Sequence, residues 1–143
     1  MKLALVFPGQ GSQAVGMMQG FADTLVVRET FEEASTALGQ DLWKLVAEGP
    51  ADELNATVNT QPVMLTSAYA MYRAWQQASA PAPVVVAGHS LGEYTALVAA
   101  GVATDLPQAR ARPLPLIGWV ASPRDSTDLS AYLDAIRNLE WLV

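Results

Sequence analysis

The chain has 143 residues, of which 51% are hydrophobic, and carries a formal net charge of −6. This length and composition allow one buried core, which excludes a disordered protein, and the acidic balance disfavours nucleic acid as a partner. No apolar run approaches the roughly 20 residues of a membrane-spanning helix, so we expect no membrane partner. With no cysteine and a single histidine, we expect neither disulfides nor a metal site.

The first predicted element is a buried strand over residues 3–7, followed by a glycine-rich loop with the sequence Pro-Gly-Gln-Gly-Ser-Gln over residues 8–13. The apolar run is too short for a signal peptide, so we expect a cytoplasmic protein. Glycines let a backbone come close to a bound group, so the Gln10 amide can face an oxyanion that develops on a thioester carbonyl. By itself the loop also fits an ordinary turn between a strand and a helix.

Helical segments are predicted between this loop and the next strand. Apolar residues at helical spacing (Phe21, Leu25, Phe31, Ala34 and Leu38) predict a helix over residues 21–38, which Gly39 ends. A second helix is predicted over residues 63–77, and the Ala-Pro-Ala-Pro sequence at residues 80–83 stops it. Because strands alternate with helices, we predict an α/β fold with a parallel sheet.

A serine between two glycines follows the second predicted strand, residues 84–87, in the sequence Gly-His-Ser-Leu-Gly-Glu over residues 88–93. A helix is predicted after it, over residues 94–100. A strand that turns sharply through Gly-X-Ser-X-Gly into a helix is typical of a nucleophile elbow, which lifts the serine hydroxyl to the positive end of that helix. The pattern therefore predicts Ser90 as a nucleophile, although Gly-X-Ser-X-Gly also occurs in structural turns.

The composition changes near residue 104. Four of the nine prolines lie between Pro107 and Pro123, and the eight Lys and Arg include no lysine beyond this point. Apolar residues at helical spacing then predict a helix over residues 128–142. We therefore divide the chain into residues 1–104 and a tail of residues 105–143.

Together the motifs resemble the malonyl-CoA:acyl carrier protein transacylase family, the acyltransferases of fatty acid and polyketide biosynthesis. The resemblance covers residues 1 to about 104 and rests on residues 7–13, on Asn-Thr-Gln-Pro at residues 59–62 before the second helix, and on residues 88–93. It implies an α/β-hydrolase-like core. Ser90 would be the catalytic nucleophile, the backbone amides of Gln10 and Leu91 the oxyanion hole, and Gln61 part of the substrate pocket.

The resemblance also implies substrates and partners. Ser90 would take a malonyl group from coenzyme A and pass it to the phosphopantetheine thiol of an acyl carrier protein. Malonyl-CoA would then be a substrate, and no cofactor would stay bound.

Several parts of the family pattern have no counterpart in this sequence. The single histidine, His89, adjoins Ser90 and is expected to line the pocket or stabilise the turn rather than act as the base; carboxylates such as Glu93 are not singled out. The family's arginine that pairs with the malonyl carboxylate is expected near Pro115, and we do not transfer its role to Arg110 or Arg112. The resemblance thus implies a truncated or frame-shifted acyltransferase without the small ferredoxin-like subdomain.

Two other functions stay open. A serine thioesterase or esterase would share the elbow but release the acyl group to water, although the Gly-Gln-Gly sequence at residues 9–11 favours transfer. A catalytically incompetent fragment would only bind acyl-CoA.

Overall fold

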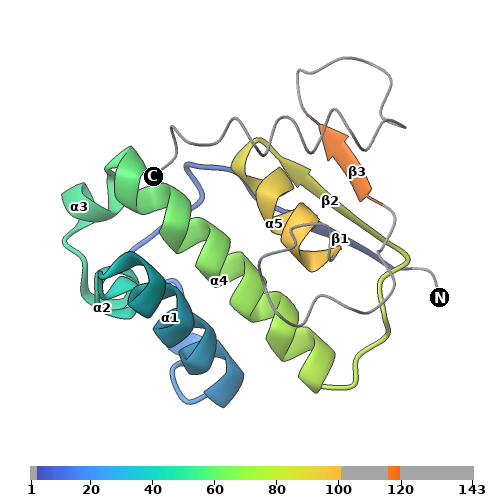
Figure 1. The fold of residues 1–143 in the computed structure, drawn as a ribbon, viewed down its shortest axis with the longest axis horizontal. Helices are drawn as coiled ribbons and strands as arrows, with labels where there is room; N and C mark the ends of the chain where they lie inside the picture. Colours follow the sequence, from blue (N-terminus) through green and yellow to red (C-terminus); the bar gives the residue numbers. More distant parts are fainter. Residues whose placement is uncertain (1–2, 101–115, 120–143) are drawn as a thin grey trace.

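The computed structural model describes residues 3–100 and 116–119, which form an α/β fold (Figure 1). The elements are β1 (Ala4–Phe7), a 3₁₀ turn η1 (Gln19–Phe21), α1 (Leu25–Leu38), α2 (Leu42–Glu48), α3 (Ala51–Asn55), α4 (Thr57–Gln77), β2 (Val85–His89), α5 (Leu91–Ala99) and β3 (Leu116–Trp119). The long helix α4 runs between the group of α1, α2 and α3 and the sheet with α5 (Figure 1). Within the described residues, no helix combines the length and apolar character that a bilayer crossing requires.

The sheet is parallel, as predicted, with the strand order β1-β2-β3. The register pairs Ala4 with Val85 and Phe7 with Gly88, so the glycine-rich loop and the elbow leave the sheet at the same edge. Strand β3 was not predicted, because its four residues lie among the prolines of the tail. The helix predicted over residues 128–142 and the boundary near residue 104 lie outside the described residues.

Helix α1 begins later than predicted. Phe21 lies in the 3₁₀ turn, and Thr24 caps the helix with an extended backbone whose carbonyl accepts hydrogen bonds from the amides of Val27 and Arg28. The predicted end is confirmed, since Gly39 adopts a left-handed φ of 66°. The predicted apolar face is partly wrong: Leu25 is 72% exposed, and the buried residues are Val26, Val27, Thr30 and Phe31.

Helix α4 begins at Thr57, so the segment at residues 59–62 lies inside the helix and not before it. Pro62 cannot donate the hydrogen bond that a residue in the second turn normally makes. Side-chain hydrogen bonds hold the turn nonetheless, because the Thr60 hydroxyl donates to the carbonyl of Leu54 at 2.6 Å in a buried contact, and Asn59 Nδ2 donates to the carbonyl of Glu53 at 2.9 Å in an exposed one. Helix α5 likewise starts at Leu91 and not at Tyr94, because Ser90 is its N-cap.

Two hydrophobic cores share helix α4. The helical core contains Phe31 of α1, Leu42 of α2 and Val63 of α4. The sheet core contains Phe7 of β1 and Val86 of β2, which pack with residues of α4 and α5. Because α4 contributes to both cores, the sheet and the helical group are expected to unfold together.

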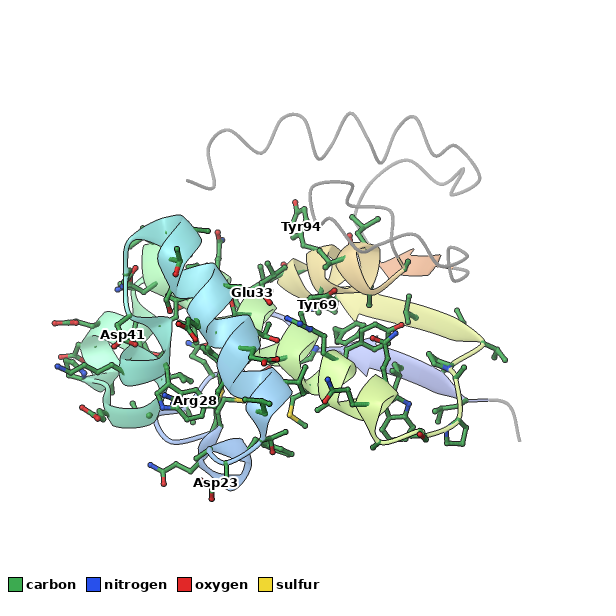
Figure 2. The ribbon with its side chains drawn as sticks, turned by 60° about the horizontal axis from the view of Figure 1, so that its bottom comes forward. Asp23, Arg28, Glu33, Asp41, Tyr69 and Tyr94 are labelled. Atoms are coloured by element: carbon green, nitrogen blue, oxygen red, sulfur yellow. The ribbon has the colours of Figure 1, made fainter. Side chains whose placement is uncertain are left out.

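The free energy of unfolding is expected to fall as the pH rises above about 10. Burial raises the pKa of Tyr69, Tyr72 and Tyr94 above the ordinary value of 10.0. At Tyr69, the cation of Arg73 opposes part of the rise, and Arg73 pairs with Glu33 of α1 at 3.0 Å. Figure 2 labels Tyr69 and Glu33. Unfolded tyrosines lose their protons first, so unfolding releases protons in this range. Urea unfolding at successive pH values, compared with the tyrosinate absorbance of the folded chain, measures the effect; stability independent of pH above 10 would contradict it.

Candidate active site

Ser90 lies in the sharp turn between β2 and α5. Its backbone has φ 52° and ψ −118°, a left-handed conformation that residues other than glycine rarely adopt. Such strain persists only where surrounding structure enforces it, and it is common at active sites. The Ser90 side chain makes no capping hydrogen bond to α5, and the residue is exposed. Its hydroxyl is therefore presented to solvent at the start of a helix.

The two glycines of the elbow allow three backbone segments to meet. A Cβ atom on Gly88 would overlap the backbone of Gly92 in the first turn of α5, and a Cβ on Gly92 would overlap the carbonyl of Phe7 and lie 2.8 Å from that of Pro8. The end of β1 thus contacts the first turn of α5 directly. No side chain fits at either position without a backbone shift.

The glycine-rich loop lies against the elbow. A Cβ on Gly9 would lie 2.9 Å from the carbonyl oxygen of His89, 3.3 Å from its Nδ1 and 3.7 Å from the Cβ of Ser90. The structure thus brings together two motifs that are far apart in the sequence, and it places Gln10 one residue from this contact.

Helices α3 and α4 anchor the loop. Gln10 Nε2 donates to Thr57 Oγ1 at 3.3 Å, and Gln13 Nε2 donates to Asn55 Oδ1 at 2.8 Å. The amide of Gly11 in turn donates to Gln13 Oε1 at 2.8 Å. Asn55 and Thr57 are not predicted from the sequence, because their hydrogen bonds to the loop leave no pattern in it.

Gln61 lies one helical turn after Thr57. Residues four apart share a face of an α-helix, so Gln61 is on the side of α4 that contacts Gln10. Gln61 is half-buried. The structure therefore brings the loop at Gly9 and Gln10 together with His89 and Ser90 at the carboxyl ends of β1 and β2, and it places Gln61 one helical turn from the residue that Gln10 contacts.

The first turn of α5 follows Ser90 and supplies backbone amides. Leu91 is buried at 7% exposure, and the first amides of a helix have no acceptor within the helix. Together with the positive end of the helix dipole, these amides can stabilise a negative charge that develops beside Ser90. The site thus combines an exposed serine hydroxyl with backbone amides that can stabilise an oxyanion beside it.

In the described part of the chain, His89, Glu93 and Tyr94 are titratable groups that adjoin the elbow in sequence. His89 is exposed and its ring faces the Gly9 loop. Glu93 is buried in the first turn of α5. Tyr94 projects from α5 (Figure 2), and its pKa is raised first by its own burial and second by the negative charge of Glu93. Among the residues that the structure describes, no three His, Cys, Asp or Glu gather as metal ligands.

Replacing Asn55 is expected to loosen the glycine-rich loop. In N55A, Gln13 loses its acceptor, and a net contribution of about 1 kcal/mol per hydrogen bond predicts a roughly fivefold faster amide exchange at Gly11. Hydrogen exchange followed by NMR measures this rate. Q40A, which removes only a 3.0 Å hydrogen bond to Asn59, is the control and should leave Gly11 unchanged. Equal exchange in both variants would show that Asn55 does not hold the loop.

The fold has a parallel sheet, a strained serine between a strand and a helix, and a second glycine-rich loop against that serine. These features are typical of α/β proteins with a nucleophile elbow. Comparison with known proteins places the chain within this class. Residues 4–112 match the acyl transferase domain family, and the chain belongs to that family.

Individual relatives cover the same part of the chain. The malonyl CoA-acyl carrier protein transacylase of Escherichia coli strain K12 is 60% identical over 102 residues, which are 71% of this chain and 33% of that protein. The crystal structure of the acyl-carrier-protein S-malonyltransferase of Burkholderia pseudomallei is 75% identical, with a TM-score of 0.70, over 71% of this chain and 33% of that one. A malonyl-transacylase in complex with a type II polyketide synthase acyl carrier protein is 53% identical, with a TM-score of 0.68 and the same coverage. The chain thus spans about a third of the length of these relatives.

Proposed function

We propose that Ser90 is the acyl-accepting nucleophile of an acyltransferase that moves a malonyl group from coenzyme A to an acyl carrier protein, in fatty acid or polyketide biosynthesis. The observation that carries the proposal is the contact of the Gly9 loop with the strained elbow at Ser90. Membership of the acyl transferase domain family, and relatives that are malonyl transacylases, support the reaction and both partners.

The proposed reaction has two halves. In the first, Ser90 Oγ attacks the thioester carbonyl carbon of malonyl-CoA, its proton passes to a base, and the carbon–sulfur bond breaks so that coenzyme A leaves as a thiol. In the second, the thiol of the carrier protein's phosphopantetheine attacks the serine ester and regenerates the hydroxyl. The amides of Gln10 and Leu91 stabilise the oxyanion in both halves, and Gln61 and His89 line the pocket. The malonyl-CoA thioester is consumed as a substrate.

The proton acceptor is expected to come from outside this chain. His89 is the single histidine, and its ring faces the loop at Gly9. We propose that three features belong to the part of the family fold that this chain does not span: the base, the arginine for the malonyl carboxylate and the ferredoxin-like subdomain. Residues 1–104 would then be the acyltransferase part, and residues 105–143 a separate tail. An enzyme that keeps its oxyanion hole without its base retains about 10³ to 10⁴-fold acceleration over water. We expect the reaction to take place in the cytoplasm, as the sequence analysis predicts.

An intact-mass experiment tests this function. The pure chain is incubated with malonyl-CoA, its mass is followed, and holo acyl carrier protein is then added. We expect a slow malonyl adduct that S90A abolishes. The matched control is S79A, because Ser79 is also exposed and also has a positive φ, 53°, but lies at the end of α4 and not in an elbow.

The fate of the adduct separates the alternatives. Transfer to the carrier protein supports the transacylase, and loss to water supports a thioesterase or esterase. If no adduct forms, or if S90A still carries one, Ser90 is not the nucleophile and the chain at most binds acyl-CoA.

A further inference from the structure

One face of the β1–β2 pair is apolar and is not covered by the described helices; Ala4 is exposed on it, and Val85 and Ala87 are half-buried. Side chains alternate between the two faces of a strand, and Leu5, Phe7 and Val86 point into the core beneath α4 and α5. The register pairs Ala4 with Val85 and Val6 with Ala87, so these four residues share the opposite face. Val6 is 72% exposed there.

Such a face is unusual for a parallel sheet. Parallel strands normally carry a layer on both faces, and for this reason they read as continuous apolar runs. Residues 3–7 and 84–87 are runs of that kind, with sequences Leu-Ala-Leu-Val-Phe and Val-Val-Val-Ala. The strand sequences therefore suit a sheet with two layers, whereas the described helices supply one.

An apolar groove of about 370 Å³ continues this face along β1. Leu5, Val6 and Phe7 all line the groove. Because consecutive side chains of a strand point to opposite faces, a groove lined by all three runs along the edge of β1. Its other wall is formed by α4 and by the loop after β1, and it is rich in methionine: Met17, Met18, Met64 and Met71. Flexible methionine side chains adapt to a partner's shape. Within the described part of the chain, β1 pairs with β2 alone, so its outer edge can accept another strand.

We propose that this surface, the open sheet face (Ala4, Val6, Val85, Ala87 and the groove along β1), binds the remaining part of the acyltransferase fold when that part is supplied as a separate polypeptide. The occupant follows from the relatives, whose chains share this third at a TM-score of 0.70 and continue over twice its length. The partner would place an apolar layer on Val6 and Ala87 and an extended segment along β1. This assembly concerns the sheet and is independent of the chemistry of Ser90.

Co-expression tests the proposal. The full chain carries an affinity tag, and the partner is the Burkholderia pseudomallei malonyltransferase without the third that matches this chain. We expect the tagged chain to retain the partner and V6K to reduce the amount retained at least about tenfold, because the partner would bury an unpaired charge. The matched controls are L25K and V58K, which introduce the same charge at residues 72% and 70% exposed but outside the groove, and they should retain the partner as the wild type does.

The other occupants give different results. If the wild type retains no partner, or V6K retains as much as L25K, the proposal is overturned. If light scattering shows that the chain alone forms a dimer that V6K separates, the occupant is a second copy. If V6K lowers the thermal midpoint of the chain alone far more than L25K, the chain itself covers the face. Retention by S90A, with or without an acyl adduct on the wild type, separates this proposal from the proposed function.

Discussion

G92A is expected to destabilise the chain by about 3 kcal/mol or more and to abolish acylation of Ser90. The added Cβ would overlap the carbonyl of Phe7 and approach that of Pro8, both of which are backbone groups that cannot rotate away. Overpacking typically costs 1–3 kcal/mol when side chains can adjust, and here the strand and the helix themselves must separate. That separation moves the end of β1, which leads directly into the loop at Gly9, away from the elbow.

G20A is the control for this prediction. A Cβ on Gly20 meets nothing within 4 Å, and the change should alter stability by less than about 0.5 kcal/mol. Urea unfolding measures both variants, and the intact-mass assay measures acylation. If G92A unfolds at the same urea concentration as G20A, the close contact between β1 and α5 is not part of the folded chain.

F31A is expected to cost about 3–5 kcal/mol, which is a fifth or more of the roughly 5–15 kcal/mol stability of a typical domain. Phe31 is 1% exposed, and its ring packs edge-on against Trp43 of α2 with the centroids 5.1 Å apart. Arg28, which Figure 2 labels on α1, lies over the same Trp43 ring, 4.1 Å from its centroid, so Trp43 contacts two side chains of α1. Removing Phe31 leaves a cavity where α1, α2 and α4 meet.

L38A on the same helix is the control, because Leu38 is 49% exposed and should contribute less than about 1 kcal/mol. Urea unfolding followed by far-ultraviolet circular dichroism gives both values. We expect one transition for F31A, since α4 joins the two cores. Two separate transitions would show that the sheet core folds without the helical core.

The parts of the fold that the sequence predicts correctly are those set by local pattern. The apolar runs before the glycine-rich loop and before the elbow become parallel strands, and Gly39 ends α1 as a left-handed residue. The start of α4 was missed because Pro62 suits the first turn of a helix, whereas buried hydrogen bonds of Thr60 carry the helix back to Thr57. The exposure of Leu25 was missed because periodicity does not fix which side of a helix meets its neighbour.

The sequence predicts the turns that carry the candidate site residues, but not the side chains that support them. Ser90 and Gln10 belong to motifs whose glycines mark turns, and these turns occur where expected. Asn55 and Thr57 hold the loop through hydrogen bonds to residues more than 40 positions away, and local sequence patterns do not report contacts of that range. Only the packing of α3 and α4 beside the loop brings these side chains into range.

The pairing of β1 with β2 determines when the site can form. Gly9 and Ser90 meet only after the chain between them has folded back through four helices, so no fragment containing one motif can assemble the pocket by local folding. Contacts of such long range form late and cooperatively, because loop closure must occur before they stabilise anything. The reactivity of a single serine would therefore report the integrity of the entire crossover, and a chain nicked within α4 and then separated would lose that reactivity.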